Sequence, residues 1–209
     1  MSNYQGIIWN PREIEQESMR QVEEFCLRLN LATGERAVVG RIIHTSGDPE
    51  LGNQVCIHPK AIERGLEALR GGAHIYTDVT MLKAGINQRK LAVYGGEIRC
   101  EIYNPEVAEE ARARGITRAA VAMEKFGNDL NGQLVAIGNA PTALFRLLQM
   151  IDQGLSPALV IGMPVGFVGA AQSKEMLMKS RIPYITVLGT RGGSPLAAAT
   201  VNALLYLQD

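Results

Sequence analysis

The sequence predicts an α/β protein whose mostly parallel sheet of five strands is covered by helices on both faces. Short apolar, β-rich runs alternate along the chain with segments whose apolar residues recur at helical spacing. Residues 133–207 repeat a unit of strand, glycine-rich turn and helix three times in succession. Consecutive units of this kind place three glycine-rich loops along one edge of one sheet, which is where open α/β sheets bind ligands.

The N-terminal part of the chain predicts two helices. Glu13–Leu31 is amphipathic, and Gly34 ends this helix. In Glu35–Asp48, four apolar β-branched residues fall at i, i+1, i+4 and i+5, which fits a helix better than a strand. Gly40 weakens this second pattern, and His44 lies near its end.

The middle of the chain predicts shorter elements bounded by glycine, Asn-Gly or Asn-Pro turns. Asp78 is predicted to cap one of these helices, Val79–Ala84. The predicted helices are His58–Leu69, Val79–Ala84, Asn104–Arg114 and Arg118–Leu130, and the predicted strands are Ala73–Thr77 and Ile98–Ile102.

The first of the three C-terminal units begins with the strand Gln133–Ile137 and continues into the helical pattern Ala143–Asp152. Pro141 suits the first helical position, with Asn139 or Ala140 as the cap. We expect the amide groups of this first turn to point out of the sheet edge towards a ligand. The other two units are Ala158–Ile161 with Gly162–Gly169 and a helix to Lys179, and Tyr184–Leu188 with Gly189–Pro195 and a helix to Leu207.

Composition limits the class of protein. With 209 residues, 46% hydrophobic and 20% charged, the chain predicts a single globular domain spanning 1–209. The formal net charge of zero argues against a nucleic-acid binder, and no apolar run approaches the ~18 residues that a membrane span needs. Three scattered cysteines predict reduced thiols and a cytoplasmic protein.

His44 is the leading candidate for proton transfer, since histidine titrates near neutral pH and this one lies beside Thr45, Ser46 and Asp48. The alternative is an ordinary histidine at a helix end, stabilised by the helix dipole. We expect structural roles for His58 and His74. The histidines are not spaced as a metal cluster, so the sequence predicts no metal site.

Several cations and hydroxyls lie near the glycine-rich loops and would suit an acidic ligand. Taken singly, each is better explained as a solvated surface group, and only its position beside the loops favours a role in binding. No G-x-G-x-x-G, G-x-x-x-x-G-K-[ST] or G-x-S-x-G motif is present. The candidates are Lys83, Arg118, Ser173, Lys174, Arg191 and Ser194.

Several blocks of the chain resemble the precorrin-8X methylmutases of corrin biosynthesis, in the order in which the family has them. They extend from about residue 13 to residue 207. The blocks are Ile43–Thr45, Asp78–Met81 with Ala84–Ile86, Ala136–Leu148, Pro164–Lys174, and Gly192–Ser194 with Ala197–Ala199 and Asn202–Ala203.

The resemblance implies an isomerase that moves a methyl group from C11 to C12 of precorrin-8X or cobalt-precorrin-8, giving hydrogenobyrinate or cobyrinate. It implies a three-layer α/β/α fold and a homodimer with pockets near the subunit interface. The family's conserved histidine falls on His44, which would donate a proton to a pyrrole-type nitrogen. A [1,5]-sigmatropic shift needs no redox cofactor, metal or covalent nucleophile, so we expect no cofactor.

The resemblance also places an active-site arginine of the family on Arg118. The position of helix N-termini and polar groups beside the loops predicts that Asn139, Ser173, Lys174 and Ser194 hold the acetate and propionate arms of the substrate, together with Arg118. We expect further substrate contacts at Thr45, Ala84, Gly85, Ile86 and Gly166. Two alternatives stay open: a nucleotide-dependent α/β enzyme, which lacks its fingerprint here, and a non-catalytic tetrapyrrole carrier of the same fold.

Overall fold

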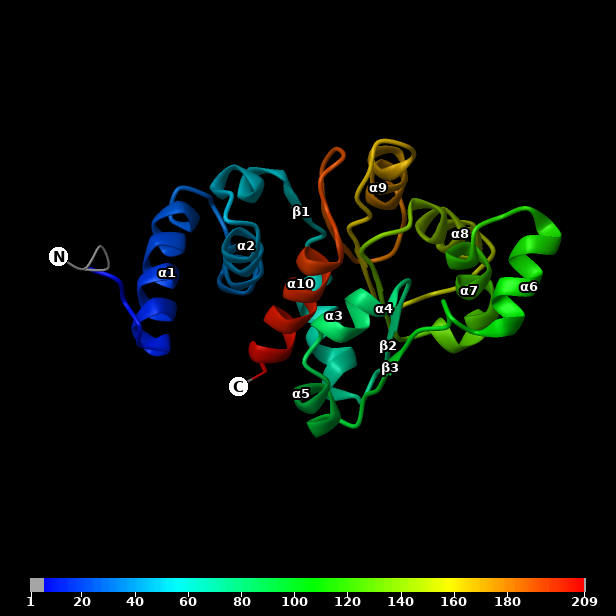
Figure 1. Cartoon of the computed structure of the whole chain (residues 1–209), viewed down its shortest axis with the longest axis horizontal. Helices are drawn as coiled ribbons and strands as arrows, with labels where there is room; N and C mark the ends of the chain where they lie inside the picture. The colour runs from blue at the N-terminus through cyan, green and yellow to red at the C-terminus, as the bar shows by residue number, and fades with distance from the viewer. Residues whose placement is uncertain (1–5, 209) are drawn as a thin grey trace.

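The computed structural model describes residues 6–208 and contains one sheet between two layers of helices (Figure 1). In these residues the sheet has six strands in the order β1-β6-β5-β4-β2-β3. All neighbouring pairs are parallel except β1 with β6. The strands are β1 Val55–Ile57, β2 Ile75–Thr77, β3 Ile98–Arg99, β4 Leu134–Ile137, β5 Leu159–Gly162 and β6 Tyr184–Val187.

The predicted α/β class and three-layer arrangement are confirmed, and the sheet has one strand more than expected. The additional strand, β1, spans only three residues and pairs antiparallel at the edge of the sheet. A half-buried run this short between a turn and a proline carries too little periodicity to predict a strand. The β3 strand is shorter than the predicted Ile98–Ile102.

The described residues form ten α-helices and two short 3₁₀ helices. The predicted helix Asn104–Arg114 is confirmed as α6, and Arg118–Leu130 divides into α7 and the 3₁₀ turn η2. The α5 helix was not expected. The helices are α1 Pro11–Cys26, α2 Thr33–Ser46, η1 Pro49–Gln54, α3 Ala61–Arg70, α4 Thr80–Gly85, α5 Gln88–Val93, α6 Pro105–Arg114, α7 Arg118–Phe126, η2 Gly127–Leu130, α8 Pro141–Asp152, α9 Ala170–Met178 and α10 Ser194–Tyr206.

Alternation along each strand divides the core into two layers. On β4, Leu134 and Ala136 face the layer that contains α3, α4, α5 and α10. Val135 and Ile137 face the opposite layer, which contains α7, α8 and α9. All four side chains are fully buried. Because both faces of the sheet are covered, the central strands β4 and β5 contain no polar side chain.

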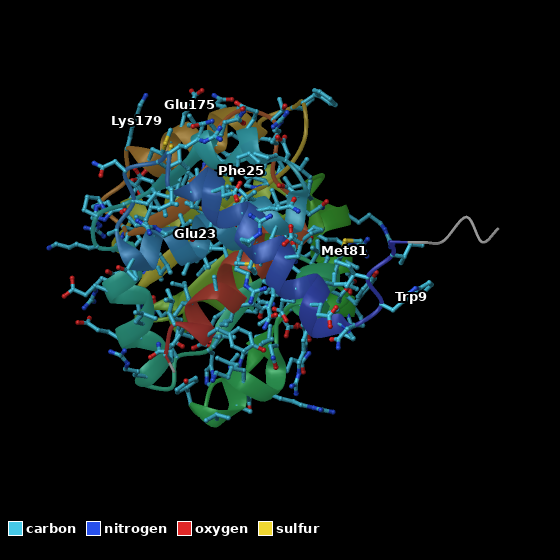
Figure 2. All side chains as sticks on the ribbon, turned by 90° about the vertical axis from the view of Figure 1, so that its left-hand side faces the viewer. Trp9, Glu23, Phe25, Met81, Glu175 and Lys179 are labelled. Atoms are coloured by element: carbon cyan, nitrogen blue, oxygen red, sulfur yellow. The ribbon has the colours of Figure 1, made fainter. Side chains whose placement is uncertain are left out.

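Beyond these layers, α2 packs on α10, and α1 lies outside α2 at one end of the molecule (Figure 1). Val22 and Cys26 of α1 pack against Val39 and Ile43 of α2. Just before α1, the side chain of Trp9 is 77% exposed and extends away from the ribbon (Figure 2). No helix within residues 6–208 has the length and apolar character needed to cross a membrane.

The parallel strands β6, β5, β4 and β2 are neighbours, so the loops that follow them meet at one edge of the sheet. The loops after β5 and β6 are joined by backbone hydrogen bonds. Gly193 donates its N–H to the oxygen of Met163 at 2.8 Å, and Gly166 donates to Thr190 at 3.0 Å. The predicted arrangement of glycine-rich loops along one edge is therefore confirmed.

Candidate functional site

The loop after β4 lies against the start of α10 at the centre of this edge. A β-carbon on Gly138 would stand 2.7 Å from the Cα of Ser194 and 2.9 Å from its nitrogen. Since both atoms belong to the backbone, only glycine permits this approach. Pro141 begins α8 and Ala140 is its cap, as predicted. Ser194 is only 5% exposed at the first turn of α10.

Asp78 caps α8 rather than the helix that follows it, which corrects the prediction from sequence. Its carboxylate accepts N–H bonds from Gly138 at 3.1 Å, Asn139 at 2.8 Å and Ala140 at 2.7 Å. No side chain caps α4. The amides expected to face a ligand therefore face Asp78 instead. Burial raises the pKa of Asp78, and the bonds from the three amides act in the opposite direction.

Lys174 is buried, although we expected an exposed cation beside the loops. The side chain is 1% exposed, and its ammonium group donates to the backbone oxygen of Arg191 at 2.5 Å. Desolvation lowers the pKa of Lys174 to about 8. Ser173 is also buried, and its hydroxyl donates to the oxygen of Ala170 at 2.9 Å. Lys174 thus holds the loop after β6 from within, whereas Ser173 bonds within the first turn of α9.

Arg191 connects the loop after β6 to the end of α2. Its guanidinium pairs with the carboxylate of Asp48, two residues beyond that helix. Asp48 also accepts an N–H bond from Glu50 at 3.0 Å and so caps η1. Arg191 is therefore held at both ends, by Lys174 through its carbonyl and by Asp48 through its side chain. This connection brings the end of α2 to the sheet edge.

His44 lies on the last turn of α2, exposed and directed towards α1. Its Nδ1 is 2.8 Å from the hydroxyl of Ser18. The two residues line a hollow of about 280 Å³ together with Phe25. Among residues 6–208, Nε2 of His44 has no hydrogen-bond partner, so this nitrogen is available to a ligand. Sequence reasoning missed Ser18, because nothing in the sequence indicates which side of the first helix meets the second.

The other two histidines have backbone partners. Nδ1 of His58 accepts the N–H of Lys60 at 3.1 Å. Nδ1 of His74 accepts the N–H of Glu97, also at 3.1 Å. Both bonds agree with the structural roles expected for these residues. Within the described part of the chain, no three His, Cys, Asp or Glu side chains are grouped as a metal site.

Thr45 follows His44 on α2 but does not line the same hollow. It lines a hollow of about 460 Å³ with Arg41, Asn202 and Tyr206. This hollow lies between α1, α2 and α10. Adjacent residues of α2 therefore contribute to two separate depressions beside α1, and the one at Thr45 also reaches α10.

Arg118 begins α7, whose N-terminal end adjoins the start of α8. The hydroxyls of Thr117 and Thr142 are 2.7 Å apart and join the two helix starts. Arg118 is exposed, with its guanidinium carbon 5.9 Å from the centre of the Tyr103 ring. Asn139, in the loop before α8, is also exposed. Arg118 and Asn139 are thus exposed on the α7–α8 side of the edge, as are Thr117 and Thr142.

The predicted contact residues Ala84, Gly85 and Ile86 lie where α4 packs on α10. A β-carbon on Gly85 would stand 2.8 Å from that of Ala198, and the oxygen of Gly85 accepts the side-chain amide of Asn202 at 2.9 Å. Ile86 is buried in the core, whereas Ala84 is exposed. This packing accounts for the glycine without a ligand.

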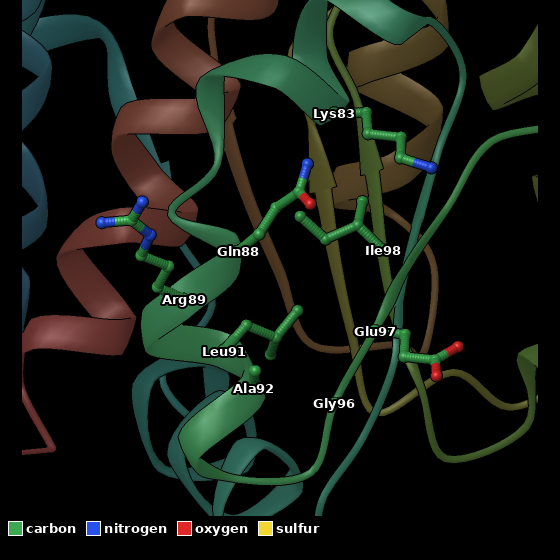
Figure 3. Close-up of a pocket in the computed structure, with 8 residues that line it drawn as sticks. All are labelled: Lys83, Gln88, Arg89, Leu91, Ala92, Gly96, Glu97 and Ile98. Atoms are coloured by element: carbon green, nitrogen blue, oxygen red, sulfur yellow. The ribbon is translucent and has the colours of Figure 1, made fainter.

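Lys83 lies away from the glycine-rich loops, in a hollow of about 440 Å³ beside the edge strand β3 (Figure 3). Arg89 and Glu97 contribute to the same hollow. Lys83 therefore does not join the group of cations that the sequence placed around the loops.

Large apolar side chains are exposed along the loop edge. Phe167 and Val168, in the loop after β5, are 95% and 88% exposed. Met81, in the first turn of α4, is 70% exposed (Figure 2). Exposed apolar groups in this number are typical of a surface that binds a large organic ligand or another protein.

Comparison with known proteins identifies a single family. The family model for precorrin-8X methylmutase matches residues 13–207. The cobalt-precorrin-8 methylmutase of Priestia megaterium is 40% identical over 209 residues, covering 100% of this chain and 93% of that protein. The Salmonella typhimurium cobalt-precorrin-8 methylmutase is 46% identical over 171 residues, covering 81% and 80%.

A solved structure gives the same result. The crystal structure of a precorrin-8X methylmutase from Thermus thermophilus aligns with a TM-score of 0.87 at 39% identity. The alignment covers 94% of this chain and 96% of that one. The strand order and the helix layers described above are therefore shared with a solved relative of nearly equal length.

Proposed function

The chain belongs to the precorrin-8X methylmutase family, and from this membership we propose that His44 supplies the proton for methyl migration on a ring bound along the loop edge. The protein is an isomerase that moves a methyl group within its substrate. The substrate is a contracted tetrapyrrole, precorrin-8X or cobalt-precorrin-8, and the product is hydrogenobyrinate or cobyrinate.

The single observation that carries the role of His44 is its pairing with Ser18. In the protonated imidazolium, Nδ1–H donates to the Ser18 hydroxyl, and Nε2–H has no partner among residues 6–208. The imidazolium can transfer this outward Nε2 proton to a nitrogen of the conjugated ring and is left as neutral imidazole. Such protonation polarises the ring system while the methyl group moves from C11 to C12, and general acid catalysis contributes roughly 10²–10⁴-fold. We assign Ser18 to orienting the imidazole.

The acid arms of the ring require cations and donors along the loop edge and beside His44. Arg118 and Asn139 are exposed on the α7–α8 side of the edge, and Thr45 is exposed on α2. We assign arm binding to these three. An arginine binds a carboxylate through two parallel N–H bonds, which also fixes its orientation. Lys174, Ser173 and Ser194 contribute indirectly in this proposal, by holding the loops on which Gly166 and the start of α10 lie.

We further propose a homodimer whose second subunit completes the site. The hollow at His44 has about 280 Å³, whereas pockets for drug-sized ligands occupy about 300–1,000 Å³. A tetrapyrrole with its acid arms exceeds the hollow. Phe167 and Val168 would be covered by the second subunit or by the ring itself. We also propose a cytoplasmic location, supported by the free thiols of Cys26, Cys56 and Cys100.

The test is conversion of precorrin-8X and cobalt-precorrin-8 by the purified protein, followed by the visible absorption of the product. We expect turnover of at least one of them without added cofactor. Binding of either compound without turnover would show the carrier alternative. Faster turnover of one compound would identify whether the natural substrate contains cobalt.

A further inference from the structure

The order of the strands defines one crevice in which an anion would ordinarily bind. Taken along the chain, β2, β4, β5 and β6 add strands in one direction, and β3 is added on the other side of β2. The point where the direction reverses lies between β2 and β4. In open α/β sheets, ligands bind outside the carboxyl ends of the strands at this point, commonly through a phosphate at a helix N-terminus.

In this chain the crevice contains the protein's own carboxylate. Asp78 directly follows β2 and is completely buried. Its oxygens accept the three successive N–H groups of Gly138, Asn139 and Ala140, which follow β4 and precede α8. The three amides converge on one carboxylate, as they would on an oxygen-rich anion.

The same contact sets the position of groups at the proposed substrate edge. Asn139 is exposed while its backbone N–H is bound to Asp78. On the other side of this loop, Gly138 lies against the backbone of Ser194. The loop is thus fixed from below by Asp78 and from the side by the start of α10. A change at Asp78 would therefore displace Asn139 and the first turn of α8 together.

We propose that Asp78 is a positioning residue that acts as an internal anion at the reversal point, holding Asn139 and the start of α8 for the substrate. This proposal rests on the proposed function, since it places the ring along this edge. It also means that the acid arms of the substrate do not enter this crevice, and that free anions do not bind there while Asp78 is present.

The test is rescue of Asp78→Ala by formate, whose carboxylate matches the group that is removed. The variant leaves three buried N–H groups without an acceptor. We expect a lower Tm and product affinity weakened about 10-fold or more. Sodium formate should restore both in a saturable manner. Sodium chloride at equal ionic strength should restore neither.

Two further variants serve as controls. Asp78→Asn fills the crevice with an amide of the same shape, so formate should not raise its Tm. Thr77→Val removes a neighbouring buried hydroxyl, which donates to the oxygen of Arg99 at 3.3 Å, without opening an anion position. Formate should leave this variant and the wild-type protein unchanged.

Each contrary result would overturn a defined part of the proposal. If formate does not raise the Tm of Asp78→Ala, the crevice is not an anion position. If formate restores the Tm but not product affinity, Asp78 does not position the substrate edge. If Asp78→Ala does not fold in the absence of formate, the yield of refolded protein is measured with and without formate in place of the Tm. A yield that formate does not increase would contradict the proposal.

Failure of the proposed function would give a different result from failure of the proposal for Asp78. A wild-type protein that does not bind the product would refute the assigned function, while the response of the Tm to formate would still report on the crevice.

Discussion

Replacing Lys174 by methionine should change how stability depends on pH. Methionine retains most of the length and apolar volume of the side chain and removes its amine. The amine is 1% exposed, and desolvation lowers its pKa from the ordinary 10.5 to about 8. Between these two values the unfolded chain binds more protons at Lys174 than the folded protein does. The free energy of unfolding contributed by this residue therefore rises with pH over that range.

The size of this change in the free energy of unfolding follows from the difference between the two pKa values. At 1.36 kcal/mol per pH unit, the interval from about 8 to 10.5 corresponds to roughly 3 kcal/mol. The wild-type protein should gain this amount relative to Lys174→Met between pH 7.5 and 11, an interval chosen to bracket both pKa values. Groups that titrate in both proteins cancel in the difference.

The assay is urea denaturation of both proteins across this pH range. Lys179→Met, at the exposed end of the same helix, is the matched control and should show no such trend. The difference should depend little on salt, because a buried group is poorly screened. A difference between wild type and Lys174→Met that is flat, or that falls as the pH rises, would refute this account of the buried amine.

Two more predictions concern the loop edge. Gly166→Val should weaken product binding by about 1–3 kcal/mol through steric obstruction. The Tm of Gly166→Val should fall about as far as that of Gly132→Val, since both glycines have positive φ angles and no neighbour within 4 Å of an added β-carbon. If Gly166→Val binds the product as tightly as the wild-type protein does, the ring is bound elsewhere. Light scattering should give a dimer mass for the wild-type protein, and Phe167→Asp should weaken association by about 2 kcal/mol or more. Val93→Asp, 75% exposed on α5, should leave the mass unchanged, and a monomeric wild type would contradict the shared site.

Local sequence patterns were sufficient to predict the strand–turn–helix units whose loops form the edge of the sheet. Pro141 at the first position of α8, and glycine turns after successive strands, are short-range signals that tertiary packing did not alter. The resemblance to a family supplied the reaction, and the comparisons bear it out. The short edge strand β1 lacked such a signal because three residues show no measurable period.

Long-range contacts could not be predicted. Asp78 bonds to amides about 60 positions away, and its role depends on β2 and β4 being neighbours. The local sequence around Lys174 predicts a solvated cation. The residue is buried because the loop after β6 covers it and accepts a hydrogen bond from its ammonium group. Ser18 meets His44 only through the packing of α1 on α2. Each of these contacts joins elements whose mutual position the sequence alone does not specify.

The most direct test of the central claim is the single-turnover rate of His44→Asn with the natural tetrapyrrole, measured together with product affinity and Tm. If Nε2 of His44 donates the proton, the rate should fall by roughly 10²–10⁴-fold. Product affinity and Tm should stay near the wild-type values, because the side chain is exposed and, within residues 6–208, is hydrogen-bonded only to Ser18. A rate close to that of the wild-type protein, or a loss of rate explained by a large fall in Tm, would contradict the assignment of His44 as the acid.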